Sequence, residues 1–139
     1  MLKASHVKYT FLISDPSQLW KLSVDGILKN KDELRAGVNS WQPDGNWTFT
    51  DATEKNWQNE TLIHIKNNVT NMILTGFIYK AYPNETFVEG KHSQLWKRGQ
   101  PDKEGYYTLQ NFESQKLITA EAYTTYHKTS IKLKGKCML

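Results

Sequence analysis

The chain repeats a short tryptophan-centred motif, and this repetition limits the folds open to it more than any other feature. Gln18-Leu19-Trp20-Lys21 recurs as Gln94-Leu95-Trp96-Lys97, and a weaker copy, Lys55-Asn56-Trp57-Gln58, lies between them. The three tryptophans are therefore spaced by 37 and 39 residues. A fixed period of this length is typical of architectures built from equivalent units. Three units with one tryptophan hairpin each predict pseudo-threefold closure, which leaves no sheet edge exposed.

A second set of matching segments follows the tryptophans. Each has an aliphatic residue, a Lys or Gln and an Asn: Leu28-Lys29-Asn30, Ile65-Lys66-Asn67 and Leu109-Gln110-Asn111. The first two begin eight residues after Trp20 and Trp57, and the third begins thirteen after Trp96. An insertion over residues 99–105, which contains two glycines, accounts for the longer third interval.

The ends of the chain are unequal in length. Only 19 residues precede Trp20, whereas 43 follow Trp96. A complete first unit therefore needs strands from both ends. We expect residues 116–119 and 131–134 to close against an N-terminal strand around Tyr9.

Alternation of apolar and polar residues with period two predicts an all-β fold. It covers residues 7–13, 47–49, 63–65, 107–109 and 131–133, and such alternation is typical of half-buried strands. Frequent turn signals separate these runs, of which Asp25-Gly26 is the strongest for a hairpin. No window of eleven or more residues has a helical apolar stripe. At 139 residues the chain fits one domain, 1–139, with repeat units around Trp20, Trp57 and Trp96.

Composition excludes several classes of protein. Cys137 is the single cysteine, so neither an internal disulfide framework nor a thiolate metal cluster can form. No segment approaches the roughly 20 apolar residues of a membrane-spanning helix, and the first residues do not form a signal peptide. Four Asn-x-Thr sequons favour a secreted glycoprotein whose leader has been removed, with a cytoplasmic chain as the alternative. The sequons begin at Asn46, Asn59, Asn68 and Asn84.

The Gln-x-Trp repeat resembles that of ricin-B-like (R-type) lectin domains, which are β-trefoils, over residues 6–134. The resemblance implies that the tryptophans of the repeat, Trp20, Trp57 and Trp96, fill the shared core. The fold-signature residues are Gln18, Trp20, Trp57, Gln94 and Trp96. It also implies a sugar site in which an Asp just after an aliphatic strand residue accepts hydrogen bonds from two adjacent sugar hydroxyls. The matching steps here are Leu34-Arg35, Leu74-Thr75 and Ile118-Thr119, and none supplies the Asp.

Aromatic residues beside polar ones predict sugar contacts of a different arrangement, because a pyranose has one apolar face and a polar rim. The second unit offers the best set, in which His92 and Glu85 accompany the candidates Tyr79, Tyr82 and Asn84. The first unit offers Trp41 and Trp47, and the third offers Tyr123 and Tyr126 with Glu121 and His127. The sequence thus predicts a carbohydrate-binding module whose partner is a glycan or glycoprotein.

Lysines in the C-terminal segment favour a different ligand. They form a basic stripe that suits a sulfated polysaccharide or another polyanion. The stripe comprises Lys128, Lys132, Lys134 and Lys136. Aromatic residues are not interleaved with it, which disfavours nucleic acid. The same scaffold could also serve as a trefoil that binds a protein partner, or as the targeting domain of a larger toxin or hydrolase.

Catalysis, cofactors and metals are not expected. The sequence has no Gly-x-Ser-x-Gly, no Gly-rich phosphate loop and no His-Glu-x-x-His. The four histidines lack the spacing of metal ligands. We therefore predict a non-enzymatic protein without a cofactor or a metal site.

Overall fold

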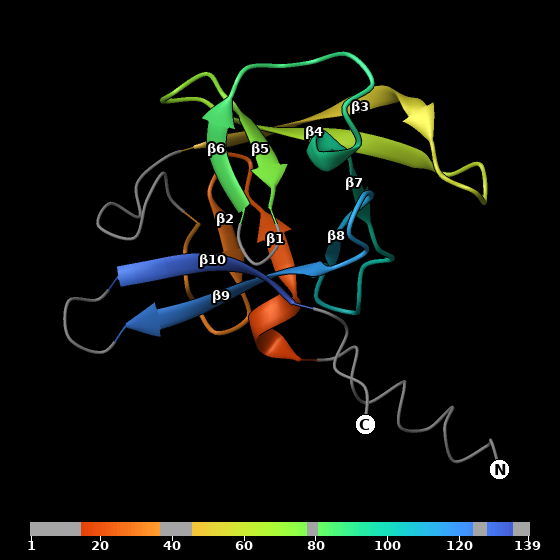
Figure 1. Ribbon diagram of the computed structural model, residues 1–139. Coiled ribbons are helices and arrows are strands. Elements are labelled where there is room, and N and C mark those ends of the chain that lie inside the picture. Colours follow the sequence, from red (N-terminus) through yellow and green to blue (C-terminus); the bar gives the residue numbers. More distant parts are fainter. Residues whose placement is uncertain (1–14, 37–45, 78–80, 124–127, 135–139) are drawn as a thin grey trace, which may run out of the picture.

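The described residues form an all-β structure of antiparallel strands. The computed structural model describes residues 15–36, 46–77, 81–123 and 128–134, and only the backbone of residues 82–84, 121–123 and 128–133 (Figure 1). Within these residues there is no α-helix, and the only helical segments are two short 3₁₀ turns, η1 (Pro16–Gln18) and η2 (His92–Gln94). The strands are β1 (Trp20–Leu22), β2 (Leu28–Asn30), β3 (Trp47–Lys55), β4 (Thr61–Asn67), β5 (Ile73–Gly76), β6 (Ala81–Glu85), β7 (Trp96–Arg98), β8 (Leu109–Asn111), β9 (Leu117–Tyr123) and β10 (Lys128–Lys134).

Two sheets contain these strands. The larger has the order β10-β9-β8-β7-β4-β5-β6, with β3 paired to β4, and β1 and β2 pair with each other. A bridge between Trp20 and Tyr107 connects the two, with N–H···O distances of 2.7 and 2.9 Å. The prediction of an all-β fold is confirmed. None of the described helical segments is long and apolar enough to cross a bilayer.

Three hairpins, β1–β2, β3–β4 and β7–β8, share one core arrangement. Each begins with a buried tryptophan that faces a buried asparagine across the hairpin. The pairs are Trp20 with Asn30, Trp47 with Asn67, and Trp96 with Asn111. Each indole Nε1 donates a hydrogen bond to a backbone carbonyl, that of Ile118 (2.9 Å), Ala36 (3.1 Å) or Leu74 (3.0 Å). A large apolar ring can therefore be buried without leaving its N–H unpaired.

Each of the three asparagines organises the turn that follows it. The Oδ1 atom of Asn111 accepts hydrogen bonds from the N–H groups of Glu113 (3.1 Å) and Ser114 (3.0 Å), and Asn30 and Asn67 act in the same way. The amide nitrogens of Asn111 and Asn30 donate to the carbonyls of Ser93 and Ser17, each three residues before the tryptophan. The matching segments ending in Asn therefore occupy equivalent positions.

The tips of the same hairpins also share one five-residue turn. The first residue of each turn accepts backbone hydrogen bonds on its side-chain oxygen, and these residues are Ser23, Asn56 and Asp102. The fourth residue has a positive φ and is Gly26, Asn59 or Gly105, all residue types that tolerate this conformation. The second residue points outward, and in β3–β4 it is Trp57, which is 88% exposed.

Two predictions about tryptophans are therefore wrong. Trp57 does not fill the core, and Trp47 is not available to a ligand, because it is only 2% exposed. Trp47 and Asn67 pair across 20 residues of chain, whereas Trp20 and Asn30 pair across 10. Trp57 therefore falls in the turn between β3 and β4, the long hairpin seen in Figure 1.

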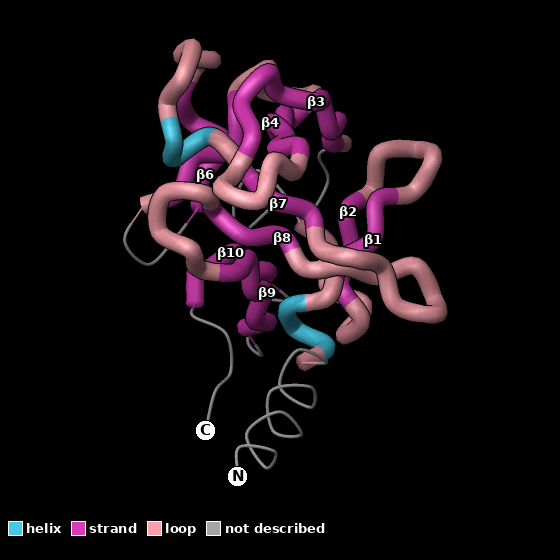
Figure 2. The backbone as a smooth tube through the Cα atoms, turned by 90° about the vertical axis from the view of Figure 1, so that its right-hand side faces the viewer, coloured by secondary structure: helices cyan, strands magenta, loops and turns pink. Residues whose placement is uncertain are grey.

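The C-terminal hairpin β9–β10 lies beside the first tryptophan hairpin. Ile118 accepts the Trp20 indole N–H, and Gln18 Nε2 donates to Thr119 Oγ1 at 3.2 Å. Ile118 in turn pairs with Leu133 of β10. Residues of β9 thus meet the N-terminal segment η1 (Figure 2), whereas β10, which contains residues 131–134, is placed by its pairing with β9. Tyr9 lies outside the described residues.

Candidate functional site

A cleft of about 450 Å³ opens beside strand β5, and we call it the Thr75 cleft. It lies between β5, the end of β6, the segment that leads into η2, and the turn after β8. Its lining residues are Thr75, Gly76, Phe77, Glu85, Gly90, Lys91, His92, Ser93 and Glu113. Its size falls within the range of small-molecule sites, about 300–1,000 Å³.

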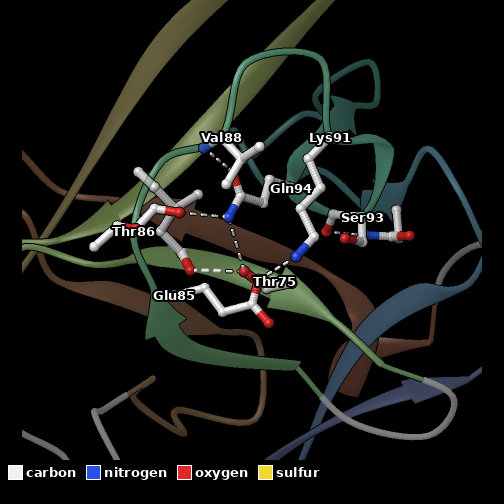
Figure 3. A network of polar contacts seen from close by, with 9 residues as sticks. Thr75, Glu85, Thr86, Val88, Lys91, Ser93 and Gln94 are labelled. Atoms are coloured by element: carbon white, nitrogen blue, oxygen red, sulfur yellow. Dashed lines mark hydrogen bonds and ion pairs between the residues drawn. The ribbon is translucent and has the colours of Figure 1, made fainter.

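The buried side chain of Gln94 fixes the inner wall of the Thr75 cleft. Its Nε2 donates to the carbonyl of Thr86 (2.9 Å) and to Thr75 Oγ1 (3.4 Å), and its Oε1 accepts from the N–H of Val88 (2.9 Å) (Figure 3). Thr75 Oγ1 donates to the carbonyl of Ile73 (3.1 Å). Gln94 therefore holds the segment after β6 against β5, and its amide is already satisfied by protein groups.

The first Gln of the repeat makes the same contact at the other end of the chain. Gln18 Nε2 donates to Thr119 Oγ1 (3.2 Å), and that hydroxyl donates to the carbonyl of Leu117 (3.3 Å). Thr75 and Thr119 each follow an aliphatic strand residue, at the position where ricin-B-like domains that bind galactose have an Asp. A buried hydroxyl there serves the Gln and the strand backbone, so neither position contributes a carboxylate.

A charged pair also lines the Thr75 cleft. Glu85 ends β6 opposite Ile73 of β5, and its carboxylate forms an ion pair with the ammonium of Lys91 (Figure 3). The two side chains are 30% and 38% exposed, so both remain in reach of a ligand. Because their charges balance, this pair offers hydrogen-bond acceptors and donors with little net field.

Aromatic groups border the same cleft. Phe77 is 40% exposed. His92 is exposed and packs edge-on against Phe112, with ring centroids 5.0 Å apart. The lining thus combines an aromatic residue with polar and charged ones, which is the combination of residue types that a sugar ring requires.

The structure brings some of the predicted ligand residues together. Glu85 and His92 line one cleft, as their shared assignment to the second unit suggested. Tyr82, Asn84 and Tyr123 lie on strands, but their side chains are outside the described part. Trp41, Tyr79 and Tyr126 lie wholly outside the described residues, as does His127.

Sequence reasoning missed the partners that complete the cleft, Lys91 and Phe77. Neither belongs to a motif, and Phe77 follows the Leu74-Thr75 step by only two residues. Thr follows the aliphatic residue in two units, at Thr75 and Thr119. This recurrence indicated that the sites around β5 and β9 differ from the Asp-containing site of the family.

Strand β10 contains three of the four lysines of the basic stripe, Lys128, Lys132 and Lys134. Of these only the Lys134 side chain is described, and it is exposed. Lys136 lies outside the described residues. Among the sequon asparagines, Asn46, Asn59 and Asn68 are exposed. Within the described part of the chain, no three His, Cys, Asp or Glu residues are grouped so as to hold a metal ion.

Comparison with known proteins supports the fold alone. No family model matches the sequence, and no curated protein matches it. Among solved structures, a chain of the cytolethal distending toxin of Haemophilus ducreyi is similar, with a TM-score of 0.52 and 11% sequence identity. The similarity covers 88% of this chain and 75% of that chain. This protein therefore resembles a toxin chain in fold, with little sequence in common.

Proposed function

We propose that the chain is a non-catalytic carbohydrate-binding module with a ricin-B-like β-trefoil fold, and that the Thr75 cleft holds its sugar. Three equivalent hairpins, each with a buried Trp–Asn pair, support the trefoil assignment. The same turn at the three hairpin tips supports it further. Likeness to a toxin chain is consistent with a module that binds a target.

The observation that carries the proposed site is that Glu85 lines a cleft whose lining also includes Phe77, a residue that is 40% exposed. Thr75 cannot accept two hydroxyl hydrogen bonds as an Asp would. Glu85 offers that acceptor from the facing strand, and Lys91 adds a donor. The ring of Phe77 supplies the apolar surface for one face of a pyranose. The lining contains two acidic residues, Glu85 and Glu113, and one lysine, Lys91, which disfavours an anionic ligand, so we expect a neutral glycan.

A glycan array with neutral and sulfated chains tests this function. We expect a defined family of neutral glycans to bind, with little change on adding salt. Glu85→Gln removes a charge-assisted hydrogen bond and should weaken binding by about tenfold. Phe77→Ala should abolish detectable binding, while the matched control Trp57→Ala, which removes an exposed ring outside the cleft, should leave it unchanged.

Two array results would contradict the proposal. A blank array from correctly folded protein would exclude the lectin function. Binding to sulfated chains alone, lost in salt, would instead indicate the stripe from Lys128 to Lys136.

A second candidate is that the module directs a larger toxin or hydrolase to its target. The shared fold with a toxin chain is the observation that favours it. Sequencing the flanking coding region for a catalytic domain would test it. A module of this kind would use the same cleft.

A further inference from the structure

A second cleft, of about 320 Å³, lies on the long β3–β4 hairpin, and we call it the His64 cleft. Residues of β3 and β4 form its floor, and the segment after β6 forms one wall. Its lining residues are Thr50, Asp51, Ala52, Thr53, Glu54, His64, Lys66, Ile73, Phe87 and Glu89. It shares no lining residue with the Thr75 cleft.

An irregularity in β3 creates this cleft. The β3–β4 register is regular from Trp47 to Asp51 and shifts between Asp51 and Lys55. A β-bulge bends a strand and redirects its side chains. Here Glu54 comes close to the segment after β6, since a Cβ built on Gly90 would lie 3.9 Å from Glu54 Oε2.

The His64 cleft is acidic in a chain that is basic as a whole. Its lining contains the carboxylates of Asp51, Glu54 and Glu89 and one ammonium, that of Lys66, whereas the whole chain has a formal charge of +4. Burial lowers the pKa of His64, against the raising effect of Glu54 and Glu89. The imidazole is therefore neutral at pH 7 and does not cancel the negative charge.

Exposed apolar groups adjoin these carboxylates. Phe87 packs edge-on against His64, with centroids 5.0 Å apart, and still remains 49% exposed. Val88 is 47% exposed. An exposed aromatic residue beside charged groups is typical of protein interfaces.

We propose that the His64 cleft binds an arginine side chain presented by a protein partner. A guanidinium stacks on an aromatic face and donates paired hydrogen bonds to carboxylates, and the cleft provides both in Phe87 and the Glu54/Glu89 pair. Val88, exposed between the lining residues Phe87 and Glu89, suits a peptide that flanks the arginine better than it suits a free ion. The interaction uses a surface separate from the proposed sugar site.

A blocked tripeptide, acetyl-Leu-Arg-Leu-amide, is the probe for this proposal, and amide NMR shifts of the whole chain are the readout. We expect saturable shifts at residues 50–54 and 86–89. The same peptide with citrulline in place of arginine has nearly the same shape without the charge, and it should cause no saturable shift. Free arginine lacks the flanking groups and should bind at least tenfold more weakly than the peptide, on the order expected for lost apolar contacts.

Variants locate the interaction. Glu54→Gln combined with Glu89→Gln should weaken peptide binding by at least about tenfold. The matched control Asp32→Asn removes an exposed carboxylate elsewhere and should bind as the unaltered chain does. Equal binding of the citrulline peptide, equal binding of free arginine, or unchanged binding by the double variant would each overturn the proposal. The citrulline and free-arginine arms need no variant, so the test stands even if the double variant fails to fold.

Discussion

At the scale of single residues, three buried asparagines connect each tryptophan hairpin to the turn after it. Their side chains are almost wholly buried, at 0 to 1% exposure. Asn111 uses both ends of its amide, accepting from two backbone N–H groups and donating to the carbonyl of Ser93. Buried backbone groups that lose their partners are costly. Removing such an amide should therefore destabilise the fold by more than one hydrogen bond contributes on average.

We predict that Asn111→Ala lowers the free energy of unfolding by about 2–3 kcal/mol, because it leaves buried groups without partners. Urea unfolding at pH 7 measures this change. Gln110→Ala, one residue earlier on β8, is the control, since its side chain makes an exposed hydrogen bond to Gln115 and should cost less than about 1 kcal/mol. Equal losses in the two variants would show that the asparagine amide has no special role.

The tryptophans also show which parts of the fold could be predicted from the sequence. The motif Gln-x-Trp correctly identified Trp20 and Trp96 as core residues, and the structure shows that their glutamines are buried as well. It failed at Trp57 because the spacing of eight residues to Ile65 matched that from Trp20 to Leu28 by coincidence. The tryptophan that pairs with Asn67 is Trp47. This pairing joins two strands and depends on the length of the hairpin between them, which local sequence does not encode.

At the scale of elements, ion pairs connect the turn after β2 to the tip of the β7–β8 hairpin. Lys31, just after β2, contacts Asp102 at 2.6 Å and Glu104 at 2.9 Å in the β7–β8 loop. The Lys31 ammonium lowers the pKa of Asp102 from 3.8 to about 2, and the hydrogen bonds to both carboxylates raise the pKa of Lys31 to about 12. The same ammonium lies over the ring of Tyr106, with Nζ 5.3 Å from the ring centroid. These contacts attach the separate β1–β2 pair to the larger sheet.

The depressed pKa of Asp102 gives this link a pH dependence. A carboxylate with a lowered folded-state pKa adds stability that is present above about pH 4 and is lost as the pH falls through about 2. Asp102→Asn removes the charge and keeps the Oδ1 that accepts from Glu104 and Tyr106. We expect the variant to be less stable than the unaltered chain at pH 7.

Urea midpoints measured from pH 7 to pH 2 test this prediction. The difference between the unaltered chain and Asp102→Asn should be constant down to about pH 4 and shrink towards pH 2. Asp32→Asn should show no such trend. A difference that stays constant to pH 2 would mean that the carboxylate charge does not support this contact.

Elements explain why the cleft was only partly predictable. The alternation of β4 and the repeat positions of β5 and β9 followed from sequence, and Glu85 and His92 were assigned to one unit. The charged pair could not be predicted, since Lys91 meets Glu85 through a segment without regular structure. The bulge in β3, which opens the His64 cleft, likewise has no local sequence signal.

At the scale of the whole molecule, one segment separates the two clefts. Residues 86–91 follow β6, with Phe87 and Glu89 lining the His64 cleft and Gly90 and Lys91 lining the Thr75 cleft. Gln94 holds this segment through the carbonyl of Thr86 and the N–H of Val88. A residue that belongs to the repeat, and is buried like a core residue, thus sets the shape of two binding surfaces.

Replacing Gln94 should therefore affect both surfaces at once. Gln94→Met keeps the length of the side chain and removes its three hydrogen bonds, at a cost of about 1–2 kcal/mol in stability, because Thr86 and Val88 are exposed and Thr75 keeps its hydrogen bond to Ile73. We expect faster amide hydrogen exchange at Val88, and weaker binding of both the neutral glycan and the arginine peptide. Gln18→Met, which breaks the equivalent contact to Thr119, should lower stability without changing either affinity. If Val88 exchange and both affinities were unchanged in Gln94→Met, the segment would be held by its own packing, and the two clefts would have to be explained independently of the repeat.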